Sequence, residues 1–511
     1  MNKNILQLLE ESVNTYPNKS ALIDENRQIS YLSYVEEAKR IGSALCKLHQ
    51  ESYSKPIIVF VDRRADSIIA FMGVLYSGNF YVPVDCKTPV ERLRSIVEVL
   101  NPLAFISFSE TEKKLVEKIG IDVPNYCYGD LVKEPIHFKK LHEIRANAID
   151  LDPAYAIFTS GSTGIPKAVA ISHRSVIDLS SWLVSTFSFQ ENDVIGNQTP
   201  FYFDGSVKDI YLSMLSGATM IIIPHKCFAF PQLLAEILNK HAATSLLWAT
   251  SAVVMIAKSG ILEELGLKTL KRLFFAGEVM YGKHLNMWKK QYPHCQYINL
   301  YGPTEVTVDS TFYIVNRAFE DNDVIPIGSH CDNKRVFILD ENNQIVDGKQ
   351  GGELAVGGSG VALGYYNNPS QTEKVFIQNP LHNHYPDVIY KTGDFVKLNA
   401  FNEIEFVGRK DFQVKHMGNR IELGEIEAAA YGLNQVQHVA CLYDAENEKI
   451  ILFYTSTQEI PASDFIKELM KSIPKYMYPN KFIRLLEMPL SANSKVDRKA
   501  IKQKFYEENQ I

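Results

Sequence analysis

The stretch at residues 158–173, FTSGSTGIPKAVAISH, gathers glycines, hydroxyl side chains and a single lysine. It holds too much glycine for a helix and too few apolar residues for a buried strand. Backbone N–H groups, hydroxyls and one cation together suit a phosphate chain. A flexible Gly/Ser loop is the alternative when the stretch is taken alone. The residues predicted to contact phosphate are Thr159, Ser160, Gly161, Ser162, Thr163, Gly164 and Lys167.

Two better-known loops do not match this stretch. A Walker A loop needs Gly-Lys followed by Ser or Thr, whereas Pro166 precedes Lys167 and Ala168 follows it. A nucleophile elbow needs a serine with glycine two positions away on each side, and no serine here has both. A P-loop nucleotide hydrolase is therefore disfavoured.

A second polar cluster begins where a strand is expected to end. Residues 297–300 form a strand-like run, and Tyr301-Gly302-Pro303-Thr304-Glu305 follows at once. Ligands of α/β sheets bind at such strand ends. The tyrosine can stack on a base, Thr304 can bond a phosphate oxygen, and Glu305 can hold Mg²⁺. Further along, the carboxylate of Asp394 could take both hydroxyls of a ribose.

The elements that must position these residues alternate between β-branched runs and helical patterns. This alternation predicts α/β layers. From about residue 328, short strands with Gly/Asn turns predict an all-β region. After Arg409, a helix at residues 421–431, two strands and two more helices predict a small α+β domain. The earlier strand-like runs include residues 55–61, 154–158, 245–249 and 273–276.

Composition sets limits on the class of protein. A chain of 511 residues is too long for one core. Its net charge of −6 carries no basic run, so we expect no nucleic-acid binding and no membrane insertion. The seven cysteines are scattered without a CxxC pair, which fits reduced thiols. The first residues lack the apolar centre of a signal peptide. We therefore expect a cytoplasmic protein.

Taken in order, nine stretches resemble the adenylate-forming superfamily over nearly the whole chain. The resemblance is nearest to adenylation domains of nonribosomal peptide synthetases and to stand-alone D-alanine–carrier protein ligases. The stretches are residues 77–85 (SGNFYVPVD), 158–173, 203–206 (FDGS), 299–307 (NLYGPTEVT), 352–366 (GELAVGGSGVALGYY), 390–394 (YKTGD), 408–427 (GRKDFQVKHMGNRIELGEIE), 473–479 (IPKYMYP) and 493–499 (NSKVDRK).

The resemblance implies a fold and a first half-reaction. Residues 1–409 would form a large domain of layered α/β subdomains with a small β-barrel-like subdomain, and residues 410–511 a small mobile α+β domain. With ATP and Mg²⁺, a carboxylate would become an acyl-adenylate and pyrophosphate would leave. The implied catalytic residues are Lys495, Thr304 and Glu305, with Glu305 on the metal. Besides the phosphate loop, the implied ATP-binding residues are Asn299, Tyr301, Gly302, Asp394 and Arg409.

The resemblance also implies a second half-reaction on a thiol. The small domain would rotate about a hinge at Asp411, withdraw Lys495, and bring Gly418 beside a phosphopantetheine arm. No carrier domain is recognised after Arg498. We therefore expect a free-standing enzyme that loads a separate carrier protein in trans.

The pocket for the carboxylate substrate follows from the same alignment. Asp204 would pair with the α-ammonium group of an amino acid, although a helix N-cap is the plainer alternative. A lysine lining the floor of such a pocket, as Lys208 would, is costly unless a partner neutralises it. A substrate carboxylate would give a glutamate-like preference, whereas Asp309 would leave a neutral pocket for a small or polar amino acid such as D-alanine. The implied pocket residues are Asp204, Gly205, Lys208, Leu247, Phe274, Ala276, Leu300, Val308 and Asp309.

Two other functions compete with this prediction. An acyl- or aryl-CoA ligase of the same superfamily is disfavoured by Asp204. A catalytically inactive adenylate-binding protein would be expected to lack Lys495, Glu305 or Asp394, and all three are present.

Overall fold

The computed structural model describes residues 3–49, 52–159, 166–409, 413–445, 447–489 and 496–508, without the side chains of residues 499, 504 and 506–508. The chain forms two compact units. The first comprises Met1–Cys86, Leu100–Phe158 and Ala168–Lys410, and the second comprises Lys87–Val99, Thr159–Lys167 and Asp411–Ile511.

A nine-stranded sheet forms the centre of the first unit. Its inner strands run parallel, and β2, β14 and β15 pair antiparallel at its edges. The parallel strands are almost fully buried, as expected for strands covered on both faces. In spatial order they are β15 (Ser329–His330), β14 (Thr311–Ile314), β13 (Gln296–Tyr301), β12 (Arg272–Ala276), β11 (Ser245–Ala249), β9 (Val194–Asn197), β10 (Thr219–Ile222), β1 (Ser20–Ile23) and β2 (Gln28–Ser30).

A seven-stranded sheet lies in the same unit and is also mainly parallel. Its order is β18 (Gly364–Tyr365), β8 (Lys167–Ser172), β7 (Pro153–Thr159), β4 (Phe80–Asp85), β3 (Pro56–Val61), β5 (Ala104–Ser107) and β6 (Asn125–Cys127). Strand β3, PIIVFV, is buried at every position. The alternation of strands and helices therefore predicted the layered α/β class correctly.

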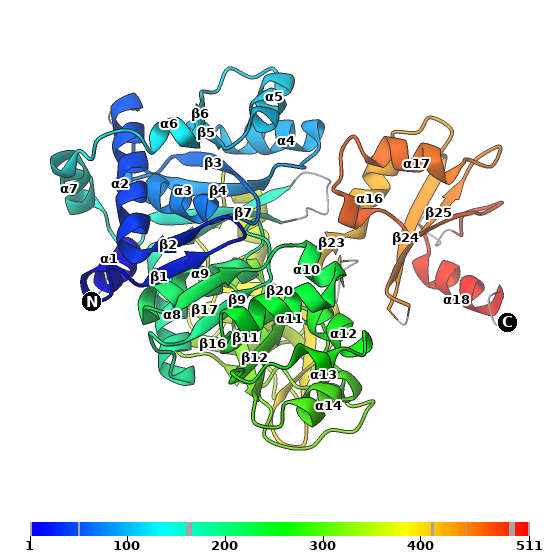
Figure 1. Ribbon diagram of the computed structural model, residues 1–511. Coiled ribbons are helices and arrows are strands. Elements are labelled where there is room, and N and C mark those ends of the chain that lie inside the picture. Colours follow the sequence, from blue (N-terminus) through cyan, green and yellow to red (C-terminus); the bar gives the residue numbers. More distant parts are fainter. Residues whose placement is uncertain are drawn as a thin grey trace. The chain divides into compact units, whose positions relative to one another are not determined.

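Helices cover both sheets, and α9 packs against β9, β10 and β11 (Figure 1). The helices of the first unit are α1 (Leu6–Thr15), α2 (Tyr31–Leu48), α3 (Ala65–Tyr76), α5 (Glu110–Ile119), α6 (Tyr128–Leu131), α7 (Phe138–Asn147), α8 (His173–Phe187), α9 (Gly205–Ser216), α10 (Lys226–Ala229), α11 (Pro231–Lys240), α12 (Thr250–Lys258), α13 (Leu262–Leu265), α14 (Gly282–Gln291) and α15 (Pro369–Val375). None of the described helices is long and apolar enough to cross a membrane.

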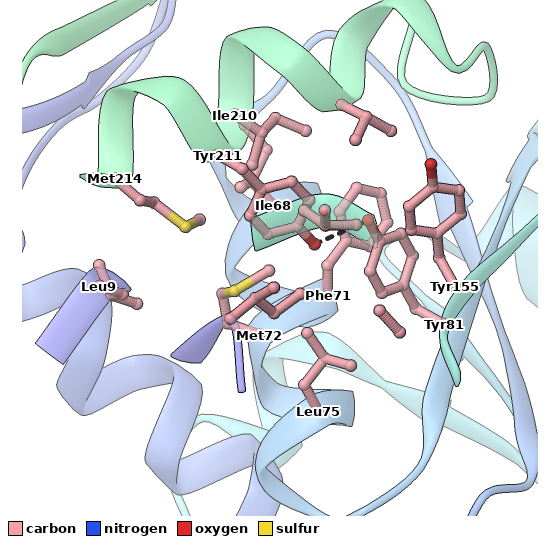
Figure 2. Close-up of a cluster of buried hydrophobic side chains, with 14 of the residues drawn as sticks. Leu9, Ile68, Phe71, Met72, Leu75, Tyr81, Tyr155, Ile210, Tyr211 and Met214 are labelled. Atoms are coloured by element: carbon pink, nitrogen blue, oxygen red, sulfur yellow. Dashed lines mark hydrogen bonds between the residues drawn. The ribbon is translucent and has the colours of Figure 1, made fainter. Parts of the chain in front are cut away.

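One hydrophobic core joins the two sheets through α3 and α9. Figure 2 shows Phe71, Tyr81 and Tyr211 turned toward one another in this core. The rings of Phe71 and Tyr81 stack with centroids 4.1 Å apart, and the hydroxyls of Tyr81 and Tyr211 lie 2.8 Å apart in a hydrogen bond. Both tyrosines are fully buried, so each hydroxyl depends on the other.

The predicted all-β region is an antiparallel sheet that completes the first unit. Its path is β16 (Lys334–Leu339), β17 (Gly352–Gly358), β20 (Val388–Leu398) and β19 (Phe376–Gln378), and β21 (Ile404–Arg409) also pairs with β20. Strand β20 reaches Leu398, several residues beyond the predicted end at residue 391, because β17 and β21 both pair along its length.

Among the described residues, the second unit contains a hairpin, a three-stranded sheet and four α-helices, one of which is α4 (Val90–Leu100), whose residues up to Val99 belong to this unit. The predicted helix at residues 421–431 begins only at Leu423, because residues 419–422 pair with residues 413–416. Met417 and Gly418 both have positive φ, 52° and 78°, as in the tight turn of a two-residue hairpin. The elements are β22 (Gln413–His416), β23 (Asn419–Glu422), β24 (His438–Asp444), β25 (Lys449–Thr455), β26 (Lys481–Arg484), α16 (Leu423–Ala430), α17 (Ala462–Leu469) and α18 (Arg498–Glu508).

The tyrosine pair in the core gives a first prediction. Replacing either Tyr81 or Tyr211 by Phe strands the other hydroxyl in apolar surroundings, at a cost of about 1–3 kcal/mol in the free energy of unfolding. The double variant removes both hydroxyls, so it should be destabilised by less than the sum of the two single variants. Denaturant unfolding of the four proteins measures this, with Tyr53→Phe at an exposed position as control. Strict additivity would contradict the assigned hydrogen bond.

Candidate active site

Three polar side chains from two sheets meet at the end of β13. The hydroxyl of Tyr301 donates to Oδ2 of Asp394, and a guanidinium N–H of Arg409 donates to Oδ1 at 2.5 Å. Only 3% of Asp394 is exposed. Burial and the neighbouring Asp394 charge raise the pKa of Tyr301 well above its usual value. Tyr301 therefore stays a neutral donor, and the two oxygens of Asp394 accept from Tyr301 and Arg409 with lone pairs to spare.

Strand pairing explains why Asp394 and Arg409 meet. Asp394 on β20 lies directly opposite Arg409 on β21, so opposite charges form a cross-strand pair. The backbone N–H of Asp394 donates to the hydroxyl of Thr392 at 3.0 Å, and that hydroxyl donates to the carbonyl of Leu354 at 2.7 Å. The carboxylate thus stands on a strand whose neighbours fix its direction.

Asn299 and Glu305 flank this cluster. The side-chain amide of Asn299 donates to the carbonyls of Ile325 and Pro326 at 3.2 and 2.9 Å, which leaves its oxygen as the acceptor for a ligand. Thr304 and Glu305 belong to the short 3-10 helix η1 (Thr304–Val306), and both are buried.

The Glu305 carboxylate is oriented by a residue that the sequence analysis did not assign. Tyr365 donates its hydroxyl hydrogen to Oε1 of Glu305 at 2.8 Å. The tyrosine belongs to β18, which pairs with β8, the strand that follows the glycine-rich stretch. Tyr365 lies within the GELAVGGSGVALGYY motif, so the motif held the signal for it.

The predicted phosphate loop is bracketed by two strands. Strand β7 ends at Thr159, which is buried, and β8 begins at Lys167. Several predicted residues lie outside the described part of the chain: Ser160, Gly161, Ser162, Thr163, Gly164, Asp411 and Lys495.

The predicted pocket residues of the nine-stranded sheet share one face. Leu247 lies opposite Phe274, and two positions further along, Ala276 lies opposite Leu300. Because side chains alternate along a strand, these two rows project to the same side. Leu247, Phe274 and Leu300 are buried in the core that also takes residues of α9.

Helix α9 presents Asp204 and Lys208 on one side. Lys208 follows Asp204 by four positions, which places both on the same helix face. Asp204 occupies the N-cap position, yet its side chain makes no capping hydrogen bond to the first turn, all of which is described. The plainer role of helix cap is therefore unsupported. A Cβ on Gly205 would lie 3.3 Å from Thr199, so this position has little room.

Lys208 meets Asp309 inside the protein. The ammonium Nζ lies 3.3 Å from Oδ1 of Asp309, and each side chain is at most 4% exposed. The sequence left two partners open for Lys208, a substrate carboxylate and Asp309. In the structure Lys208 contacts Asp309. Oδ2 of Asp309 is buried without a hydrogen-bond partner among the described residues.

A third buried ionisable residue beside this pair was missed from the sequence. Asp209 is fully buried and accepts a hydrogen bond from the side-chain amide of Asn197 at 2.6 Å. Burial raises the pKa of Asp209 to about 7, against the hydrogen bond of Asn197 and the charges of Lys208 and Arg63. Arg63 in turn donates to the carbonyls of residues 197, 198 and 223. The sequence did hold a signal for Asp209: two charged residues, Lys208 and Asp209, stand next to each other within an otherwise largely apolar helix.

Sequence comparison identifies the family. The profile of the AMP-binding enzyme family matches residues 9–366. Zwittermicin A synthase ZmaJ of Bacillus cereus is 31% identical over 512 residues, which cover 97% of this chain and 94% of that protein. The chain therefore belongs to the AMP-binding enzymes. Tyrocidine synthase 1 of Brevibacillus parabrevis is 30% identical across 98% of this chain, and gramicidin S synthase 1 of Brevibacillus brevis is 29% identical across 98%. The chain spans only 45% and 44% of the lengths of these two relatives.

Solved structures confirm the fold of a large and a small domain. The Vibrio cholerae adenylation domain AlmE, in complex with glycyl-adenosine-5'-phosphate, matches with a TM-score of 0.84 at 21% identity over 99% of this chain and 98% of that chain. PA1221, a protein containing adenylation and PCP domains, matches with a TM-score of 0.82 at 21% identity over 100% of this chain and 98% of that chain.

The raised pKa of Asp209 predicts a pH dependence. The folded protein keeps this proton up to about pH 7, whereas the unfolded chain releases it near pH 4. The contribution to stability is therefore fully present below pH 4 and is lost as the pH rises toward 7. Asp209→Asn is neutral throughout, so between pH 5 and 8 it should gain about 2–3 kcal/mol relative to the wild type.

Thermal unfolding of both proteins across this pH range is the measurement. Asp193→Asn is the control. Although burial acts against it, hydrogen bonds and cations lower the pKa of Asp193, so its difference from the wild type should stay constant above pH 5. A constant difference for Asp209→Asn as well would show that Asp209 is ionised in the folded protein.

Proposed function

We propose that this chain activates an amino acid with ATP and then transfers it to a thiol. The carboxylate would attack the α-phosphate, forming an aminoacyl-adenylate and releasing pyrophosphate. The aminoacyl group would then pass to the phosphopantetheine arm of a separate carrier protein. The observation that carries this proposal is the buried cluster of Tyr301, Asp394 and Arg409 beside Glu305, in a chain of the AMP-binding family.

The nucleotide would occupy the end of β13. Asp394 would accept the ribose hydroxyls with its remaining lone pairs, helped by Arg409, and the oxygen of Asn299 would face adenine, which Tyr301 and Gly302 border. Thr304 and the loop from Thr159 to Lys167 would contact the phosphates. Such positioning and charge neutralisation supply most of the rate in phosphate chemistry.

The donor set also fits Mg²⁺. Among the described residues, no group of three or more His, Cys, Asp or Glu could hold a metal ion. Mg²⁺ commonly takes one or two carboxylates and completes its shell with substrate phosphates and water. Glu305, buried and oriented by Tyr365, would provide that one carboxylate. Bound there, the ion would neutralise charge on the phosphates.

The amino acid would lie between α9 and the sheet. Asp204 would accept its ammonium group, and Leu247, Phe274, Ala276, Leu300 and Val308 would border its side chain. The contact of Lys208 with Asp309 supports a neutral pocket, and so a small or polar amino acid, D-alanine included, ahead of glutamate. A glutamate side chain would require Lys208 to exchange Asp309 for the substrate.

The second step would use the small domain and a carrier protein in trans. Asp411 is proposed as the hinge between residues 1–409 and residues 410–511. Gly418 stands at the tip of the β22–β23 hairpin, where the lack of a side chain would leave room for the phosphopantetheine arm. No disulfide joins any of the seven cysteines, all of which are described, and this supports a cytoplasmic location.

Lys495 is proposed to bridge the substrate carboxylate and the α-phosphate. Lys495→Ala should lower the rate of adenylation about 10²–10³-fold, because a charge that stabilises the transition state is lost. ATP binding, followed by calorimetry, should survive. Lys481→Ala, at an exposed position of β26, is the control and should match the wild type. Full adenylation by the Lys495 variant would remove this residue from the mechanism.

The substrate is tested by amino-acid-dependent ATP–pyrophosphate exchange with L- and D-glutamate, glutamine and D-alanine. Exchange should appear with one of them and fall about 10²-fold or more in Asp204→Ala, which leaves the substrate ammonium unpaired. Asp122→Ala, on an exposed loop, is the control. Exchange only with aryl or fatty acids, and transfer to free CoA rather than to a carrier protein, would favour a CoA ligase. Silence with every acid would favour the inactive adenylate-binding alternative.

A further inference from the structure

The loop of residues 306–310, which follows η1, holds a backbone conformation that its residues disfavour. Thr307 and Val308 have φ of 59° and 65°, in the left-handed region that β-branched residues rarely adopt. Such a conformation persists only where the surrounding structure holds it in place. The loop also carries Asp309, the partner of Lys208. Whatever anchors the 306–310 loop therefore also places that carboxylate.

Lys334, the first residue of β16, is the anchor. Its ammonium is buried and donates to the carbonyl of Val306 at 2.9 Å and to that of Thr307 at 3.3 Å. It donates as well to the carbonyl of Asp309. An ammonium has three hydrogens, so these three carbonyls of one loop can use every donor that Lys334 has.

Two glycines allow the close fit of the 306–310 loop and its anchor. A Cβ on Gly360 would lie 2.5 Å from Cε and 2.8 Å from Nζ of Lys334. A Cβ on Gly302 would lie 2.2 Å from the carbonyl oxygen of Val308. Neither position can take a larger residue without a shift of the loop or of the lysine.

The ammonium of Lys334 is costly to bury. Burial lowers the pKa of Lys334, because an ammonium is disfavoured away from water. The loop carbonyls offset that cost with hydrogen bonds to a charged donor, which are stronger than neutral ones. A neutral side chain would fill the space with less penalty but could not bind three carbonyls at once.

We propose that Lys334 is a positioning residue that sets amino-acid selectivity by holding Asp309 against Lys208. Lys334 binds the main chain of Asp309, and Lys208 meets its carboxylate at 3.3 Å. Because Lys334 contacts backbone carbonyls of the loop, it acts through Asp309 and not on the substrate. The inference rests on the proposed function and adds to it a residue that governs the choice of side chain.

The test compares Lys334→Met with Lys19→Met. Lys19 is partly buried and, like Lys334, donates to a backbone carbonyl, that of Gly217 at 2.5 Å. It lies just before β1 and away from the 306–310 loop. In Lys334→Met, KM for the preferred amino acid should rise about tenfold, and the ratio of kcat/KM between the preferred and the next amino acid should fall about tenfold. KM for ATP should stay within about twofold, and Lys19→Met should change none of these values.

Amide hydrogen exchange gives a readout that needs no activity. The amides of residues 306–310 should exchange at least about tenfold faster in Lys334→Met and unchanged in Lys19→Met. If Lys334→Met does not fold, Lys334→Gln carries the test, since it keeps two N–H donors and should show smaller shifts in the same direction. Unchanged exchange in the loop, or equal losses for every amino acid and ATP, would overturn the inference. Faster loop exchange in a protein that activates no amino acid would uphold the anchor and reject the proposed function.

Discussion

The contact between Lys208 and Asp309 constrains the rest of the site because it holds two opposite charges where water does not reach. Removing one member of a buried pair leaves the other uncompensated, which is far more costly than the pair itself. The surrounding structure is arranged accordingly. Lys334 binds the loop that carries Asp309. Asp209, which lies beside Lys208, has a pKa of about 7, so it is mostly protonated below that pH and adds little negative charge. Under the proposed function, the choice of substrate would depend on how this part of the core balances its charge.

Many strands and the class of fold could be predicted from the sequence, because strands that are buried on both faces leave clear apolar runs in it. The run at residues 245–249 is β11 to the residue, and the all-β region after residue 328 is an antiparallel sheet. The β22–β23 hairpin was missed because its strands are short and charged, so they show no alternation. The sequence of residues 421–422 is typical of the start of a helix, but in the structure these residues pair with residues 413–414 as part of that hairpin.

Candidate site residues could be named from the sequence where they sit in motifs, and not where only tertiary burial sets their contacts. Asp394 and Arg409 were proposed from the motifs that contain them, and strand register places them opposite each other. Lys334 had no such signal, since a lysine between Asn333 and Arg335 is typical of an exposed strand. Its burial depends on Gly360 and on the 306–310 loop, which approach it only in the folded chain.

The joining of Tyr301 and Asp394 has a consequence for how the protein is made. The first belongs to the nine-stranded sheet and the second to the antiparallel sheet, and 93 positions of chain separate them. During synthesis the carboxylate of Asp394 emerges long after β13, the strand that ends at Tyr301. A nascent chain thus lacks this contact until both sheets have assembled, and the nucleotide site proposed above would be incomplete until then.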